Sequence, residues 1–254
     1  MLTTRFVPGS PCWVELDSPH LETAERFYGG LFGWEFEEQV PEYAFCQLGG
    51  RNVAGIGALM GEAVTTAWTP YFLVSDCEAT SQTVERAGGT VLMPPVDMAS
   101  QGQMARFRDP AGAEFAIWLP GDVPGVDLVN EPGSMAWIEL RESDTSAVRG
   151  FYKSVFGWRF EDARMGDVTY QLISPFGSAP GTGSSVAGLA PLAPGDRPHW
   201  LTYFEVPDCD AAVARCQELG GTVRSPAEEV KGVGRMASLS DPHGARFAVI
   251  TSSG

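Results

Sequence analysis

The second half of this chain repeats the first, and this repeat limits the folds open to the chain more than any other feature. The segments Trp13–Leu16 (WVEL) and Phe32–Trp34 (FGW) return as Trp137–Leu140 (WIEL) and Phe156–Trp158 (FGW), at the same separation in both cases. Self-similarity at a fixed separation is the signature of a repeated structural unit. Rare aromatic residues that recur in the same order and register therefore indicate an internal duplication.

Motifs further along the first copy also recur in the second, but with more residues between the two occurrences. Trp68, Asp76–Cys77, Gly88–Val91 and Asp109–Gly112 become Trp200, Asp208–Cys209, Gly220–Val223 and Asp241–Gly244. The second copy thus contains eight additional residues, which we place most simply in the Gly/Ser/Pro-rich stretch Ser174–Ser185. A Gly/Pro-rich segment without strong periodicity separates the copies. We predict a first domain at residues 8–120, a linker at 121–133 and a second domain at 134–252.

Each copy divides again into two similar stretches of strands and one helix. Alternating residues over 11–16 predict a strand, and helical spacing over 21–32 predicts a helix. Further strands are expected at 42–48 and 52–59. The pattern restarts with a strand at 68–74, a helix at 78–87 that ends at two glycines, and a hairpin of 103–107 with 114–119. The sequence therefore predicts four βαβββ units in an α+β fold of mixed sheets.

Composition and charge narrow the class of partner. The 254 residues carry a net charge of −15, and such an acidic surface repels nucleic acid and anionic membranes. No stretch approaches the roughly 18 apolar residues of a membrane-spanning helix, and the first residues lack a signal-peptide pattern. The five cysteines include no CxxC pair. We expect a cytoplasmic monomer or homodimer whose partner is a small molecule, with no nucleic acid and no membrane.

The order of these motifs resembles the vicinal oxygen chelate superfamily, which includes glyoxalases, bleomycin-resistance proteins and extradiol dioxygenases. The resemblance rests on a helix ending in Phe27–Trp34 (FYGGLFGW), on Val74–Asp76 (VSD), on the paired glycines and on the DPxG turns, in both copies. It implies tandem domains whose four βαβββ units form two curved mixed-sheet cups. The units can pair as first with second and third with fourth, or crossed, as first with fourth and second with third. A linker of about 14 residues spans either arrangement, and we favour the crossed one.

The same resemblance implies where a metal would bind. Members of the family usually hold a divalent metal at the cup floor with His and Glu from matching strand positions. These positions map to Trp13, Thr69 and Ala116 in the first copy and to Trp137, Leu201 and Ala248 in the second. None of these side chains is a ligand for zinc, iron or nickel. We therefore expect neither a metal nor another cofactor. His20 and His243 are expected to be exposed surface residues.

Strand alternation assigns the side chains that line each cup. The predicted ligand-binding residues are Trp13, Glu15, Thr69, Tyr71, Glu114 and Trp118 in the first cup, and Trp137, Glu139, His199, Leu201, Tyr203 and Arg246 in the second. A largely apolar concavity with few polar groups suits a planar or aromatic ligand. His199 and Arg246 stand where the first copy has Ala67 and Glu114. The first cup should therefore prefer cationic ligands, and the second should tolerate anionic or phenolic ones.

Structural explanations compete with these assignments. Trp13 and Trp137 could fill the space of a metal as core residues, and Glu15 and Glu139 could pair with a neighbouring arginine. Gly55 and Gly188 would then permit close strand packing. The FGW segments are expected in the core.

The favoured function is a metal-independent small-molecule binding protein, similar to the bleomycin-resistance branch, that takes a planar natural product or antibiotic. The alternative is a metal-independent isomerase, cyclase or lyase. In that case Glu15 and Glu139 are the candidate catalytic residues, because a carboxylate in an apolar cup has a raised pKa suited to acid–base work. A metal-dependent glyoxalase or dioxygenase and a scaffold without ligand are less favoured.

Overall fold

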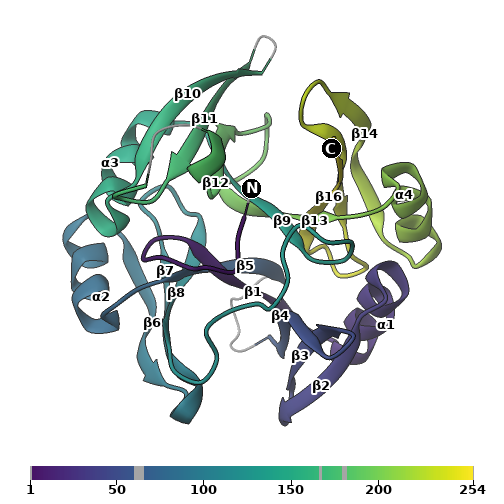
Figure 1. The fold of residues 1–254 in the computed structure, drawn as a ribbon, viewed down its shortest axis with the longest axis horizontal. Helices are drawn as coiled ribbons and strands as arrows, with labels where there is room; N and C mark the ends of the chain where they lie inside the picture. Colours follow the sequence, from purple (N-terminus) through teal and green to yellow (C-terminus); the bar gives the residue numbers. More distant parts are fainter. Residues whose placement is uncertain (1, 60–65, 166–167, 179–181, 254) are drawn as a thin grey trace. The chain divides into compact units, whose positions relative to one another are not determined.

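Two curved mixed sheets of eight strands each build the fold (Figure 1). The computed structural model describes residues 2–59, 66–165, 168–178 and 182–253. In these residues a helix follows the first strand of each βαβββ unit, and the unit occurs four times. The predicted α+β class and the tandem vicinal oxygen chelate architecture are therefore confirmed.

The strand order is the same in both sheets. It is β2-β3-β4-β1-β5-β8-β7-β6 in the first and β10-β11-β12-β9-β13-β16-β15-β14 in the second. The first sheet contains β1 (Pro11–Ser18), β2 (Glu35–Val40), β3 (Tyr43–Leu48), β4 (Arg51–Ala58), β5 (Ala67–Leu73), β6 (Thr90–Asp97), β7 (Gly102–Arg108) and β8 (Glu114–Pro120). The second contains β9 (Met135–Glu142), β10 (Arg159–Met165), β11 (Val168–Ser174), β12 (Ala187–Pro191), β13 (His199–Glu205), β14 (Thr222–Val230), β15 (Gly234–Ser240) and β16 (Arg246–Ser252). The helices are α1 (Leu21–Phe32), α2 (Cys77–Arg86), α3 (Thr145–Phe156) and α4 (Cys209–Glu218), with short 3-10 turns at Ala99–Gln101 and Thr182–Ser184.

The repeated motifs mark the ends of the helices. Gly33 and Gly157 follow α1 and α3 in the left-handed conformation, with φ of 74° and 67°. Glycine adopts this conformation without steric cost, which explains the glycine of each FGW segment. Asp76 and Asp208 precede α2 and α4, and each carboxylate accepts the backbone N–H three residues on. These aspartates supply the N-caps of the second helix in each copy.

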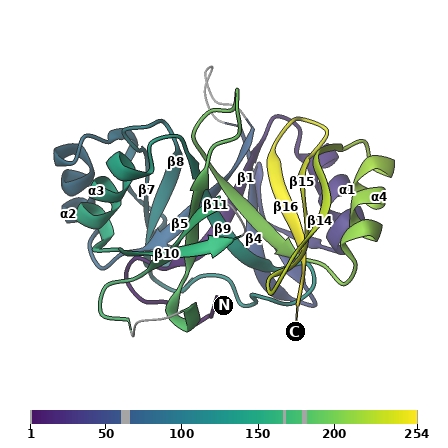
Figure 2. The ribbon, with the colours of Figure 1, turned by 90° about the horizontal axis from the view of Figure 1, so that it is seen from above.

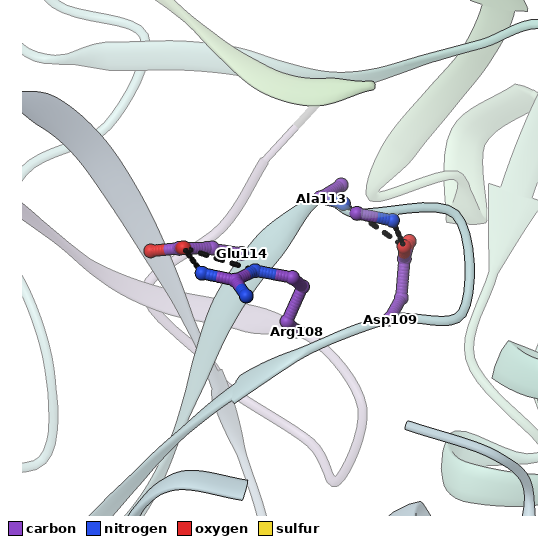
Figure 3. A network of polar contacts seen from close by, with 5 residues as sticks. Arg108, Asp109, Ala113 and Glu114 are labelled. Atoms are coloured by element: carbon purple, nitrogen blue, oxygen red, sulfur yellow. Dashed lines mark hydrogen bonds and ion pairs between the residues drawn. The ribbon is translucent and has the colours of Figure 1, made fainter. Parts of the chain in front are cut away.

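The DPxG motif closes the last hairpin of each copy. One carboxylate oxygen of Asp109 accepts the backbone N–H groups of Ala111, Gly112 and Ala113 at 3.0, 2.8 and 2.9 Å. Figure 3 shows this aspartate folded back onto Ala113 in the turn between β7 and β8. Asp241 accepts two backbone N–H groups in the equivalent turn between β15 and β16. The aspartate therefore satisfies donors that a tight turn would leave unpaired.

The chain packs into two compact units whose composition differs from that of the two sequence copies. Unit 1 consists of Met1–Cys12, Pro70–Gly125 and Trp137–Trp200, and unit 2 of Trp13–Thr69, Val126–Ala136 and Leu201–Gly254. In unit 1, α2 contacts α3, and in unit 2, α1 contacts α4 (Figures 1 and 2). The crossed pairing that we favoured, first unit with fourth and second with third, therefore describes how the helices of these βαβββ units pack. Each sheet, by contrast, takes its strands from two consecutive βαβββ units.

Aromatic side chains fill the core of unit 2. Phe32 of α1 and Trp34 lie 5.0 and 5.5 Å from Phe204 of β13, measured between ring centroids. Trp68 of β5 donates its indole N–H to the hydroxyl of Tyr28 on α1 at 2.9 Å. The Phe32 and Trp34 contacts join the first βαβββ unit to the fourth, and the Trp68–Tyr28 bond ties the first strand of the second unit to the first. They place the first FGW segment in the core, as the sequence predicts.

Unit 1 repeats this core with the second and third βαβββ units and with Trp200 of β13, from the fourth. The rings of Tyr152 and Trp158 stack at 4.9 Å, and Phe72 of β5 meets Trp158 at 5.0 Å. Trp200 donates its indole N–H to the Tyr152 hydroxyl at 3.1 Å. Pairs of buried aromatic rings add about 0.5–1.5 kcal/mol each beyond the area that they bury. Equivalent residues thus stabilise both units.

The additional residues of the second copy lie in two places, which corrects the single insertion that we expected at Ser174–Ser185. Arg159 pairs with Ser174 where the first copy pairs Glu35 with Gln47, so the β10–β11 hairpin is three residues longer than the β2–β3 hairpin. Gly188 pairs with Glu139 as Gly55 pairs with Glu15, which places six more additional residues between β11 and β12, and the second copy is one residue shorter between this glycine and Trp200. The larger part of the insertion therefore does fall where we expected it, although residues 179–181 lie outside the described residues. Within the described part of the chain, no helix is long and apolar enough to cross a membrane.

Candidate functional site

One face of each sheet points away from the helices, and we call it the helix-free face. Phe115 of β8 packs against Tyr152 of α3, and Phe247 of β16 packs against Tyr28 of α1. Because side chains alternate along a strand, the residues on either side of these phenylalanines lie on the helix-free face. The alternation assumed from the sequence therefore holds on both strands.

A tryptophan and a tyrosine, which strand alternation predicts on the helix-free face, are hydrogen-bonded in unit 1. Trp137 of β9 donates its indole N–H to the hydroxyl of Tyr170 on β11 at 2.8 Å. Gly188 of β12 lies between these strands, paired with Glu139 on one side and Leu172 on the other. A Cβ on Gly188 would overlap the Tyr170 hydroxyl oxygen. The glycine therefore makes room for the phenol that meets the indole.

Unit 2 holds the equivalent trio from the first copy. A Cβ on Gly55 would lie 2.9 Å from the indole nitrogen of Trp13 and would overlap the hydroxyl oxygen of Tyr43. The ring of Trp13 also meets Phe45 edge-on, with centroids 5.2 Å apart. Trp13 is buried, whereas Trp137 is half-buried. The exposed part of an indole is available for stacking, so Trp137 is the better placed of the two to meet a planar ligand.

A carboxylate and a guanidinium lie beside the tryptophan in unit 1. Glu139 and Arg141, two residues apart on β9, form an ion pair. The Glu139 side chain is 6% exposed and that of Arg141 is 31% exposed. The pairing of Glu139 with a neighbouring arginine is the structural explanation considered above. Glu15 is half-buried, and Asp17 stands where the second copy has Arg141, so the two copies differ in charge here.

The remaining predicted residues are divided between the units. Thr69, Tyr71, Leu201 and Tyr203 are buried, and Arg246 is half-buried. Glu114 pairs with Arg108 across β7 and β8 at 2.6 Å (Figure 3). Trp118 donates its indole N–H to the Val123 carbonyl at 2.8 Å, and Nδ1 of His199 lies 2.8 Å from the Arg197 carbonyl. By unit, Tyr71, Glu114, Trp118, Trp137, Glu139 and His199 belong to unit 1, and Trp13, Glu15, Thr69, Leu201, Tyr203 and Arg246 belong to unit 2. The ligand-binding role of each stays a prediction.

The residues at the family's metal positions do not fit a metal. An indole nitrogen carries a proton and donates it, as Trp137 does to Tyr170. Alanine and leucine offer no ligand atom, and a threonine hydroxyl is a weak one. In the described residues no group of three or more His, Cys, Asp or Glu side chains is placed to hold an ion. The side chains present cannot supply the usual coordination of this family.

The cysteines do not supply a nucleophile either. All five are buried, and burial raises the pKa of Cys77, Cys209 and Cys216 to about 11. A thiol with such a pKa remains protonated near neutral pH, and the thiolate is the reactive form.

Sequence reasoning missed Tyr43, Tyr170 and Arg141. The two tyrosines occupy equivalent strand positions, and a comparison of the copies that allowed an insertion before Tyr170 would have paired them. Arg141 carried no such signal, because its counterpart in the first copy is an aspartate.

Comparison with known proteins places both copies in one superfamily. Residues 13–117 match the Glyoxalase/Bleomycin resistance protein/Dioxygenase superfamily, and residues 137–250 match the glyoxalase-like domain family. The chain is 37% identical to the anthracycline biosynthesis protein DnrV of Streptomyces peucetius, over 97% of this chain and 94% of that protein. It is 33% identical to the "Putative glyoxylase CFP32" of Mycobacterium bovis, over 97% and 96% of the two chains. The 2,3-dioxygenase LapB from Pseudomonas sp. KL28 has the same fold, with a TM-score of 0.66, 15% identity and coverage of 97% and 94%.

Proposed function

We propose, on the premise that this chain belongs to the Glyoxalase/Bleomycin resistance protein/Dioxygenase superfamily, that it is a metal-independent binding protein for a planar aromatic molecule. The observation that carries the proposal is the Trp137–Tyr170 hydrogen bond, and the family resemblance maps the position of Trp137 to a metal ligand. An indole held by a hydrogen bond offers a flat apolar surface in a fixed orientation. These side chains therefore favour stacking with a ligand over coordination of a metal.

The side chains of the helix-free face and the name of one relative together indicate the class of ligand. Aromatic rings with few polar groups recognise flat molecules whose edges carry hydroxyl or carbonyl oxygens. Anthracyclines are planar polycyclic quinones of this kind, and a protein of anthracycline biosynthesis is 37% identical to this chain. We propose a hydroxylated polycyclic aromatic natural product as the ligand.

The proposal is tested by titrating the full chain with a planar dihydroxyanthraquinone, followed by calorimetry and by quenching of tryptophan fluorescence. Saturable binding is expected, and Trp137→Ala should weaken it by about 1–3 kcal/mol if this residue is the anchor. A thermal melt of the same variant provides the control. A loss of about 3–5 kcal/mol in unfolding free energy, with unchanged affinity, would instead identify Trp137 as a core residue.

A metal-independent enzyme is the second candidate, and the relative named as a glyoxylase favours it. Glu139 is the carboxylate beside Trp137, yet its ion pair with Arg141 engages the group that would accept a proton. Glu139→Gln separates the two functions. A binding protein should retain affinity in this variant within a few-fold, whereas an acid–base enzyme would lose turnover of its substrate by about 100-fold or more.

A further inference from the structure

Two of the three histidines, from opposite ends of the chain, lie against each other in unit 2. The ring centroids of His20 and His243 are 5.1 Å apart, and the ring planes are inclined by 53°. His20 is exposed and His243 is half-buried. The sequence predicts both as exposed surface residues, which is confirmed for His20 but not for the half-buried His243. The contact arises because the first and fourth βαβββ units pack together.

The backbone around both rings is held by one hydrogen-bonded framework. His243 lies in the turn between β15 and β16, where its backbone N–H donates to the Asp241 carboxylate at 2.9 Å. The other oxygen of Asp241 accepts the hydroxyl of Tyr28, which belongs to α1. His20 is the residue immediately before α1. The segments that carry the two imidazoles are therefore fixed with respect to each other.

His20 occupies a position where another residue would stabilise the helix better. It is the N-cap of α1 but makes no capping hydrogen bond with its side chain. The equivalent residue of the second copy, Asp144, accepts the N–H groups of Ser146 and Ala147 at the start of α3. Departures from a local rule concentrate at functional sites. The imidazole of His20 is therefore not needed for the helix.

His243 contributes a ring nitrogen that the protein does not use. Its Nε2 is shielded from solvent and has no hydrogen-bond partner among the described residues. A buried polar atom without a partner is costly and calls for an explanation, such as an ion or a water molecule. An ion between the two rings would satisfy this nitrogen.

The separation of the rings matches that of two imidazoles on one ion. With nitrogen about 2.0–2.1 Å from the metal and the ring centre about 1.1 Å further, two tetrahedral ligands have centroids about 5 Å apart. The observed 5.1 Å agrees with this value. The net charge of −15 raises the local concentration of cations around the chain.

We propose that His20 and His243 form a two-imidazole site for a divalent transition-metal ion of the Cu²⁺ or Zn²⁺ type, with water completing the coordination. Imidazole is a preferred ligand of both ions. In unit 1 the equivalent positions hold Asp144 and Ala111, so the two copies differ at this point. The site uses neither Trp137 nor Tyr170, so it and the proposed aromatic site can each fail alone. An ion here joins the two chain segments of unit 2 and stabilises their packing.

The test uses the full chain without a histidine tag, stripped with EDTA and titrated with Cu²⁺ alone and with Zn²⁺ alone by calorimetry. The Cu²⁺ complex is also examined by electron paramagnetic resonance. The variants are His20→Asn, which can cap the helix without adding a metal-binding carboxylate, and His243→Ala, which introduces the residue found at the equivalent position of the first copy. His199→Gln is the control, because it removes the third histidine. Circular dichroism checks that each variant is folded.

The expected result is one ion per chain, with an affinity at least tenfold lower in either variant and unchanged in the control. The resonance spectrum should show hyperfine splitting from two imidazole nitrogens, and the ion should raise the melting temperature of the unchanged chain only. Equal affinity in the unchanged chain and in both variants would overturn the proposal. So would the absence of binding to the unchanged chain, which would leave the two rings in simple contact.

Discussion

The hydroxyl of Tyr28 on α1 donates a hydrogen bond to the carboxylate of Asp241, 213 residues further along the chain, at 3.2 Å. In unit 1, Tyr152 on α3 donates to Asp109 at 3.0 Å in the same way. Each hydroxyl also accepts an indole N–H, so a buried Trp–Tyr–Asp chain runs through each core. The Tyr28–Asp241 bond joins the first βαβββ unit to the fourth, and the Tyr152–Asp109 bond joins the third to the second, so both support the crossed packing.

Removal of either tyrosine hydroxyl should destabilise the unit that contains it. Tyr28→Phe and Tyr152→Phe leave a buried indole N–H and a carboxylate oxygen without their partner, at a cost of about 1–3 kcal/mol each. Denaturant unfolding monitored by circular dichroism measures the loss. Losses at both sites as small as those of ordinary surface substitutions, about 0.5 kcal/mol or less, would show that the Trp–Tyr–Asp chains contribute little.

The buried aspartates should make stability depend on pH in a defined direction. Burial raises the pKa of Asp109 and of Asp241, although backbone N–H groups and a tyrosine hydroxyl oppose the rise. The folded protein therefore keeps these protons at pH values where the unfolded chain has lost them. Stability from this source is present below the ordinary aspartate pKa and is lost as the pH rises through the raised value.

Asp109→Asn isolates this effect, because asparagine does not titrate and its side-chain oxygen can still accept the turn N–H groups. The difference in unfolding free energy between the unchanged protein and the variant should shift in favour of the variant as the pH increases from about 4 to 7. Urea titrations at several pH values provide the measurement. A difference that stays constant over this range contradicts the assignment.

Gly188→Ala should disturb the Trp137–Tyr170 pair directly. The new Cβ would overlap the Tyr170 hydroxyl, so this side chain must move and the hydrogen bond from the indole must break. We expect a loss of about 1–3 kcal/mol in stability and weaker binding of the anthraquinone probe. Gly150→Ala in α3 is the matched control, since its Cβ meets nothing within 4 Å. That helical glycine should be neutral or stabilising by about 0.5–1 kcal/mol when replaced.

The Glu139–Arg141 pair should behave as a unit. Arg141→Met alone leaves a buried carboxylate without its cation and should cost about 3–5 kcal/mol. The double variant Glu139→Gln, Arg141→Met should recover most of this loss, because no buried charge remains. A double-mutant cycle in urea measures the coupling. Simple addition of the two single losses would show that the ion pair is not coupled in the folded state.

The sequence was informative wherever a motif has a local physical cause. Gly33 and Gly157 are recognisable because a left-handed residue is needed after each helix, and Asp109 because a tight turn needs an acceptor. The alternation of side chains predicts one shared face for Trp137 and Glu139, because a strand has a fixed period of two. These features need no knowledge of the tertiary structure.

Other features depend on contacts between distant segments and were not predictable from one sequence. The edge strand β2 (Glu35–Val40) is mostly exposed and rich in glutamate, so it has no apolar alternation to detect. His20 and His243 meet only because the first and fourth βαβββ units pack together. Arg141 pairs with Glu139, but the first copy has Asp17 at the position equivalent to Arg141. A comparison of the two copies therefore gives no sign of this ion pair.

The central claim is that the helix-free face binds a planar aromatic molecule without a metal, and one measurement tests it most directly. The full, untagged chain is stripped with EDTA and titrated with the dihydroxyanthraquinone, then titrated again after addition of Mn²⁺, Fe²⁺ or Zn²⁺. The His20→Asn, His243→Ala double variant is treated in parallel, so that an ion at the histidines is not mistaken for one at the face. The account predicts saturable binding to the stripped protein, with the same affinity after each metal and a loss of affinity in Trp137→Ala. Binding that appears only after metal addition, in the double variant as well, would contradict it.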